Sequence, residues 1–128
     1  IKHREDFRPF AGTILVEEVS NYFNVPEDKH DSPFMTFVFK VREDKKKYIP
    51  SITHIDGTCR IQTVSRDQNQ LYYDLIKEFG RLTAVPILLN TSFNVKGEPI
   101  VCTPEEAYND FLTTPMDYLV LNNFLITK

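Results

Sequence analysis

The sequence predicts an α/β protein with a single mixed sheet and flanking helices. Three observations predict it: apolar residues recur at helical spacing over 71–82, a short continuous apolar run follows at 85–89, and a helix-capping signal stands at 103–106. Helical and extended segments therefore alternate along the chain, as they do in α/β folds. A chain of 128 residues has room for one core, so we expect one domain spanning 1–128.

The first predicted strand covers residues 34–41. Phe37, Phe39 and Val41 share one side of an extended segment there, so we expect the strand to be buried on at least one face. The charged run 42–47 that follows has mixed signs and is typical of a solvated connection.

A tight turn is predicted at Asp56–Gly57. This dipeptide readily adopts the positive backbone angles of a turn, and it separates the short apolar segments 52–55 and 60–64. We expect a hairpin or a sharp loop at this place.

The clearest predicted helix follows Asn69, a residue suited to cap its amino terminus, and Gly80 marks or weakens its carboxy-terminal end. The apolar positions with helical spacing are Leu71, Tyr72, Leu75, Ile76, Phe79 and Leu82. The apolar run 85–89 then predicts a strand covered on both faces.

The last part of the chain predicts one more helix and a broken strand. Thr103, Pro104 and Glu106 combine a capping hydroxyl, a proline at the first helical position and a glutamate placed to complete a capping box, so a helix to about Leu112 follows. The extended segments are 118–121 and 124–126, with a break at 122–123.

The composition excludes several classes of protein. Hydrophobic residues make up 41% and charged residues 26%, which is ordinary for a soluble fold, and no apolar run is long enough to cross a bilayer. The net charge of −3 argues against a broad nucleic-acid surface. Cys59 and Cys102 lie in no metal-binding or disulfide pattern, so we expect reduced thiols in a cytoplasmic protein.

Three cations, Lys2, Arg4 and Arg8, fall within the first eight residues. Lys2 and Arg4 point to the same side of an extended segment, and convergent cations of this kind can bind a phosphate or a carboxylate. The alternative is a solvated terminus in which Glu5 and Asp6 neutralise the charge.

A second group of polar side chains surrounds the predicted turn. Thr58 and Arg60 follow it, and Arg60 stands between apolar neighbours, where a charge needs a partner. That partner is either an ordinary carboxylate or a ligand, and a purely structural polar turn accounts for the same residues.

The third group follows the apolar run 85–89. Asn90, Ser92 and Asn94 come directly after it, at the place where open α/β sheets commonly bind ligands. Short polar side chains and backbone amides can hold phosphate oxygens there. The alternative is a purely structural loop in which the asparagines stabilise turns.

Together, three motifs resemble the carboxy-terminal domain of NodU/CmcH-type O-carbamoyltransferases. They read IKHREDFRPF at 1–10, HIDGTCRIQTV at 54–64 and LLNTSFNVKGEPI at 88–100. The similarity continues through 103–107 and 117–121, and only 24–50 is weakly diagnostic. The resemblance implies a YrdC-like fold and a carbamoyltransferase that works in two stages.

In the family, this domain makes carbamoyl-adenylate from carbamoyl phosphate and ATP, with Mg²⁺ expected alongside ATP. An amino-terminal domain, which these 128 residues lack, moves the carbamoyl group to an acceptor hydroxyl. We therefore expect small-molecule substrates and the amino-terminal domain of the full-length chain as partners, no membrane or nucleic-acid partner, and no transfer activity from this chain alone. The acceptor is not readable from these residues.

The resemblance also implies roles for individual residues. Lys2 with Arg4, and Ser92 with Asn94, match the Lys-x-Arg and Ser-x-Asn pattern of YrdC proteins. The implied catalytic set is Lys2, Arg8 and Arg60, and the implied substrate-binding set is Arg4, Thr58, Asn90, Ser92 and Asn94, with no protein metal ligand. The alternative reading is a non-catalytic ligand-binding or interaction module of a larger protein.

Overall fold

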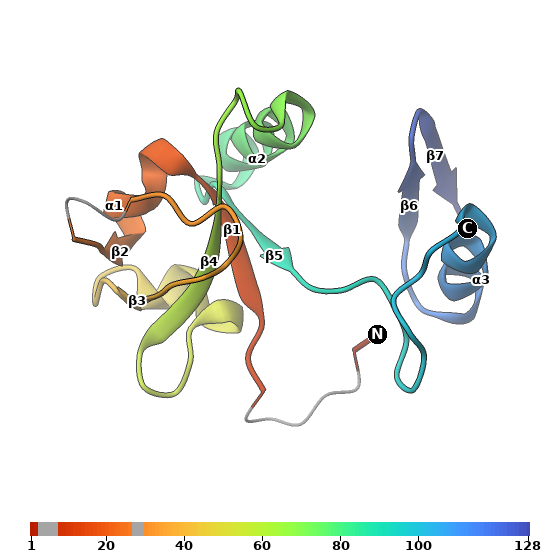
Figure 1. Ribbon diagram of the computed structural model, residues 1–128, viewed down its shortest axis with the longest axis horizontal. Coiled ribbons are helices and arrows are strands. Elements are labelled where there is room, and N and C mark those ends of the chain that lie inside the picture. Colours follow the sequence, from red (N-terminus) through yellow and green to blue (C-terminus); the bar gives the residue numbers. More distant parts are fainter. Residues whose placement is uncertain (3–7, 27–29) are drawn as a thin grey trace. The chain divides into compact units, whose positions relative to one another are not determined.

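The computed structural model describes residues 1–2, 8–26 and 30–128. They form two compact units, a larger one within residues 6–91 and a smaller one that joins the first residues to 92–128 (Figure 1).

The described part of the larger unit contains a five-stranded mixed sheet with the order β2-β3-β4-β1-β5. β1 and β4 are parallel and the other neighbouring pairs are antiparallel, which confirms the predicted α/β class with a mixed sheet. The strands are β1 (Ala11–Leu15), β2 (Phe23–Asn24), β3 (Val38–Val41), β4 (Thr58–Val64) and β5 (Ile87–Asn90).

Short helices connect these strands and one long helix packs on the sheet. The elements are η1 (Val16–Glu18), α1 (Val19–Tyr22), η2 (Lys46–Tyr48), η3 (Pro50–Ile52) and α2 (Gln70–Thr83). The predicted cap of α2 is confirmed, since the Asn69 side chain accepts a hydrogen bond from the backbone N–H of Tyr72 at 3.1 Å.

The sheet separates two apolar clusters. One face carries the larger cluster, in which Ile14, Phe23 and Ile61 are fully buried. On the other face, Ile76 of α2 packs against Leu15 and Val64 at the carboxyl ends of the parallel strands. β1 is buried at every position because it lies between β4 and β5 and both its faces are covered.

α2 continues past Gly80 to Thr83 and is capped by Ala84, which has a positive φ of 62°. A Cβ atom at Gly80 would lie 2.7 Å from Pro86 Cβ, so the glycine permits the chain after the helix to pass close to it. Gly80 thus serves packing inside the helix and does not end it.

Several details differ from the sequence predictions. β5 is an edge strand with Leu89 exposed, so it is not covered on both faces. Residues 52–55 form no strand, and the sharp-loop alternative holds: Gly57 has a φ of 78° and its N–H bonds to His54 O at 2.9 Å. β3 begins only at Val38, and Phe37 is exposed.

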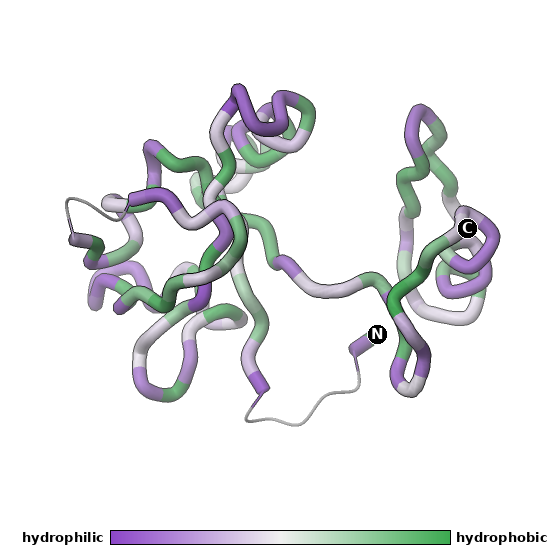
Figure 2. Tube along the Cα trace, in the orientation of Figure 1, coloured by the Kyte–Doolittle hydropathy of each residue, from purple (hydrophilic) through white to green (hydrophobic). Residues whose placement is uncertain are grey.

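The smaller unit contains α3 (Pro104–Thr113) and a hairpin of β6 (Tyr118–Leu121) and β7 (Phe124–Thr127). The predicted capping box is confirmed, with Thr103 and Glu106 bonded reciprocally. Figure 2 shows a mainly hydrophobic hairpin with a hydrophilic turn, at which Asn122 has a φ of 50°. No helix among the described residues is long and apolar enough to cross a membrane.

Candidate functional site

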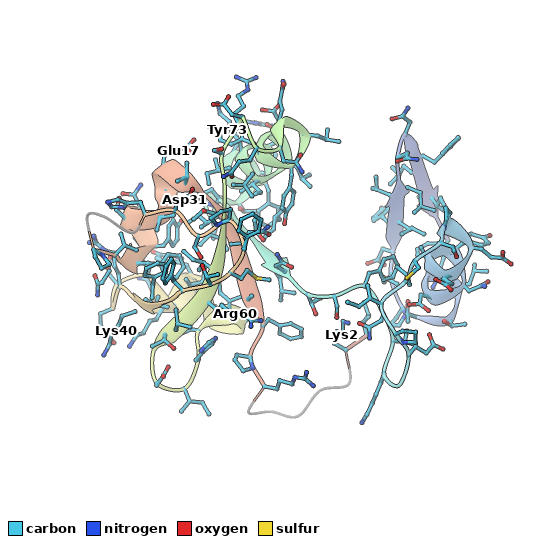
Figure 3. The ribbon with its side chains drawn as sticks, viewed as in Figure 1. Lys2, Glu17, Asp31, Lys40, Arg60 and Tyr73 are labelled. Carbon is cyan, nitrogen blue, oxygen red and sulfur yellow. The ribbon has the colours of Figure 1, made fainter. Side chains whose placement is uncertain are left out.

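Lys2 brings the first and third sequence motifs together in the smaller unit. Its Nζ donates hydrogen bonds to Ser92 Oγ at 3.1 Å, to Asn94 Oδ1 at 2.7 Å and to Asn94 O at 2.9 Å. Figure 3 labels Lys2 in this unit. An ammonium group, a hydroxyl and an amide therefore meet although 90 residues separate Lys2 from Ser92.

The loop that carries Ser92 and Asn94 is tied by its own hydrogen bonds. Ser92 Oγ donates to Asn94 Oδ1 at 2.7 Å, and Asn94 Nδ2 donates to Glu98 O at 2.8 Å. The backbone N–H of Val101 donates to Phe93 O at 3.0 Å, which closes the loop. An anion that binds here would meet the Lys2 ammonium and would compete with Asn94 Oδ1 for it.

A second polar group lies in the larger unit, on the face of the sheet that carries α2. Arg60 shares this face with Thr58 and Gln62, because side chains alternate along β4, as its burial pattern confirms. The register pairs Lys40 of β3 with Thr58, so Lys40 adds a second exposed cation to the face. Within the described part of the chain, Arg60 makes no ion pair.

The surroundings of Arg60 differ from the sequence prediction, in which a charge between apolar neighbours needs a partner. The guanidinium is exposed, so water can solvate it and it needs no buried partner. The exposed cation is consistent with a ligand-facing role, and it does not act as a fold-stabilising ion pair among the described residues.

Sequence reasoning missed the hydrogen-bond network beside Arg60. Asn90 Nδ2 donates to Thr13 Oγ1 at 2.9 Å and to Gln62 Oε1 at 2.7 Å, and Thr13 Oγ1 donates to Gln62 Oε1 at 3.2 Å. Three strands, β1, β4 and β5, each supply one of these side chains. The alternation along β4 could have identified Gln62, but Thr13 lies on a strand that the sequence did not predict.

Thr58 is engaged in the turn that precedes β4. Its hydroxyl donates to Asp56 Oδ1 at 2.7 Å and its backbone N–H reaches the same oxygen at 2.9 Å. These bonds from Thr58 lower the pKa of the Asp56 carboxyl. His54 Nδ1 lies 3.1 Å from Thr58 Oγ1, and because that hydroxyl donates to Asp56, the imidazole is the donor in this contact. These contacts match the structural alternative for the turn.

Comparison with known proteins identifies the family. The family model described as Carbamoyltransferase C-terminus matches residues 1–128. The chain belongs to the carbamoyltransferase family. It is the carboxy-terminal domain of NodU/CmcH-like proteins, as the three motifs indicated.

Individual relatives agree with this assignment. The chain is 48% identical over 128 residues to nodulation protein NolNO of Sinorhizobium fredii. The match covers 100% of this chain and 19% of that protein. It is 38% identical over 101 residues to the 3'-hydroxymethylcephem-O-carbamoyltransferase of Amycolatopsis lactamdurans. This match covers 79% of this chain and 18% of that protein. An uncharacterized protein of Methanocaldococcus jannaschii is 45% identical over 125 residues, and the match covers 98% of this chain and 24% of that protein. The chain thus spans 18 to 24% of the length of these relatives.

The structure places the predicted site residues in two groups. Lys2, Ser92 and Asn94 meet in the smaller unit, and Arg60, Thr58 and Asn90 lie on one face of the larger unit's sheet. Arg8 is exposed just before β1 and makes no hydrogen bond or ion pair with another described residue. Arg4 lies outside the described residues. The roles of all these residues, and the likeness to the YrdC fold, stay predictions.

Proposed function

We propose that this carbamoyltransferase domain binds carbamoyl phosphate and ATP and forms carbamoyl-adenylate, which the remainder of the longer protein uses to carbamoylate a hydroxyl group. The single observation that supports this most is the contact of Lys2 Nζ with Ser92 and Asn94. Lys2, the first residue of the Lys-x-Arg pattern, meets both named residues of the Ser-x-Asn pattern there.

The proposed reaction builds negative charge on oxygen atoms. Carbamoyl phosphate is hydrolysed to carbamate and phosphate, and a carbamate oxygen then attacks the α-phosphorus of ATP while pyrophosphate leaves. The Lys2 ammonium would hold a phosphoryl or carbamoyl oxygen, and the Ser92 hydroxyl would orient it. Fixed cations of this kind stabilise developing charge, and positioning supplies most of the remaining acceleration in phosphoryl transfer.

In this proposal Mg²⁺ arrives with the ATP phosphates. Among the described residues no group of three His, Cys, Asp or Glu side chains could hold a metal ion. Mg²⁺ is often bound through substrate phosphates with few protein ligands. The protein's own part in the reaction is therefore assigned to cations and hydrogen-bond donors.

No protein nucleophile is needed, and Cys59 does not suit that role. Its side chain is fully buried, and burial raises the pKa of the thiol to about 12. A thiol that stays protonated at neutral pH is a weak nucleophile.

The proposal is tested on the full-length protein by measuring pyrophosphate release that depends on carbamoyl phosphate. We expect Lys2→Ala to reduce this release by at least about tenfold, because one charge-assisted contact is lost. Lys96→Ala is the matched control: Lys96 is an exposed lysine in the same loop as Ser92, and its removal should leave the rate unchanged. Wild-type protein that is folded yet binds both substrates without releasing pyrophosphate would favour the ligand-binding module instead.

A further inference from the structure

A cavity of about 340 Å³ lies wholly within the smaller unit, between α3 and the segment before it. Its polar lining consists of Glu98, Glu106, Asn109, Asp110 and Thr113, and residues 99–101 supply its apolar wall. Three of the lining side chains are carboxylates and none is a cation. The cavity therefore has a negative potential.

Asp110 is the unusual member of this lining. The residue is only 6% exposed, and its Oδ2 is buried without a hydrogen-bond partner among the described residues. A buried carboxylate oxygen without a donor is costly, and native proteins rarely leave one unpaired. Because Asp110 lines the cavity, a hydrogen-bond donor that occupies the cavity lies beside this carboxyl group.

The neighbouring carboxylates do not supply the hydrogen-bond donor that Asp110 Oδ2 lacks. Glu106 Oε2 is occupied as a cap, since it accepts the backbone N–H groups of Cys102 at 2.7 Å and Thr103 at 3.1 Å. These two bonds lower the pKa of Glu106, so its negative charge persists near Asp110, one helical turn away. Glu98 is exposed at the edge of the cavity and adds a further negative charge.

The character of the cavity selects an organic cation over a metal ion. No three of the described His, Cys, Asp and Glu residues are placed to hold a metal. The volume lies at the lower end of small-ligand pockets, and the wall at 99–101 suits an aliphatic stem. A guanidinium or ammonium group on such a stem supplies both the charge and the N–H donors that Asp110 lacks.

We propose that this cavity binds a guanidinium or ammonium group through the carboxylate of Asp110. The group comes either from an arginine or lysine side chain of the remainder of the longer protein or from a free amine. This site uses none of the residues assigned to carbamoyl-adenylate formation, so the inference stands independently of the proposed function.

The test uses hydrogen exchange of the backbone amides of α3 in the full-length protein, comparing wild type with Asp110→Asn. If no cation is present, replacing this unpaired buried carboxyl group leaves exchange unchanged or slows it. If a cation pairs with Asp110, the same substitution leaves that cation without its carboxylate partner, and exchange of α3 should accelerate by at least about tenfold. Asp117→Asn, an identical change at an exposed position of the smaller unit, should have no effect.

A second set of measurements distinguishes the source of the cation. If the source is a free amine, n-butylguanidinium should slow exchange of α3 in wild type but not in Asp110→Asn, and neutral n-butylurea should do nothing. If a side chain of the polypeptide already fills the cavity, the probe has no effect while the acceleration by Asp110→Asn remains.

Glu98→Gln provides a variant that does not disturb the interior, because Glu98 is exposed. It should accelerate exchange of α3 a few-fold by weakening the attraction for the cation, and it serves if Asp110→Asn does not fold. Unchanged exchange in the variants that fold, together with no effect of the probe on wild type, would overturn the proposal.

Discussion

Arg60 and Lys40 are exposed cations on the polar face of the sheet in the larger unit. Arg60 differs from Lys2 in its contacts. Lys2 is already bonded to Ser92 and Asn94, whereas Arg60 makes no ion pair with any described residue. A guanidinium held by a central strand with its charge in solvent is suited to receive an anion.

Replacing Arg60 tests this assignment. Arg60→Ala in the full-length protein should lower carbamoyl-phosphate-dependent pyrophosphate release by about 10- to 100-fold, because a charge-assisted contact to substrate is lost. The melting temperature should change little, since the side chain is exposed. Arg60→Lys should rescue only part of the rate, because an ammonium cannot make a planar paired contact.

Arg66→Ala is the matched control for Arg60→Ala. Arg66 is also exposed and lies just beyond the same strand, where it approaches Asp74 at 4.0 Å. A large loss of melting temperature in Arg60→Ala, with its activity preserved at lower temperature, would show that Arg60 is structural.

Cys59 and Cys102 should react very differently with iodoacetamide. Burial raises the pKa of Cys59 to about 12, so it stays protonated and inaccessible at pH 8, whereas Cys102 is exposed. Mass spectrometry of the native protein should find Cys102 alkylated and Cys59 unmodified. Since the unfolded thiol ionises near pH 9 and the folded one near 12, this residue's contribution to stability is present below about pH 9 and is lost as the pH rises toward 12. Alkylation of Cys59 at a rate similar to Cys102 would contradict its burial.

The sequence predicted the site residues unevenly, for physical reasons. Arg60 and Gln62 lie on one side of β4, and this placement is predictable because alternation follows from backbone geometry alone. The family resemblance nominated Lys2 and Asn94 as site residues, but their contact was not predicted, since no local pattern reports a contact across more than 90 residues. The buried, unpartnered Asp110 was missed because its helical spacing is ordinary and only the packing reveals its environment.

At the scale of secondary-structure elements, α2 shows how two apolar surfaces can share one helix. Ile76 is buried against the sheet, with Tyr72 and Tyr73 packed beside it. Leu71, Leu75 and Leu82 are exposed by 81%, 56% and 69%, although they contributed to the same helical pattern. The periodicity therefore predicted the helix correctly but could not say which of its apolar faces meets the sheet.

Gly80 gives a prediction at this scale that reverses the usual rule. Glycine to alanine inside a helix normally stabilises by about 1 kcal/mol. Here the new Cβ would lie 2.7 Å from Pro86 Cβ and 3.0 Å from Pro86 Cα, so we expect Gly80→Ala to destabilise the protein by about 1–3 kcal/mol. Hydrogen exchange of α2 measures the change, and Lys77→Ala on the exposed side of the helix is the control. Slower exchange in Gly80→Ala would mean that Pro86 can move away.

The capped helices were the most predictable elements and the central strand was the least. Asn69 and the Thr103–Glu106 capping box place helix starts by local hydrogen bonds, so the sequence located both starts correctly. β1 reads Ala-Gly-Thr-Ile-Leu and is buried on both faces, so it shows no alternation and was not predicted. The edge position of β5 depends on strand pairing, which an apolar run does not report.

At the scale of the whole molecule, the predicted site residues divide between the two compact units. The smaller unit carries Lys2, Ser92 and Asn94, and the larger unit carries Arg60, Thr58 and Asn90. The regions of the longer relatives that match this chain make up 18 to 24% of their length. The proposal assigns adenylate formation to this sequence and transfer of the carbamoyl group to the remainder.

The most direct test of that assignment is detection of the intermediate itself. Full-length protein is mixed with ¹³C-carbamoyl phosphate, ATP and Mg²⁺ in the absence of any acceptor, quenched rapidly and analysed by mass spectrometry. The account predicts ¹³C-carbamoyl-AMP in wild type and in Lys96→Ala, and at least about tenfold less in Lys2→Ala and Ser92→Ala. Transfer of the label to an added acceptor without any carbamoyl-AMP, or equal amounts of carbamoyl-AMP in all four proteins, would contradict it.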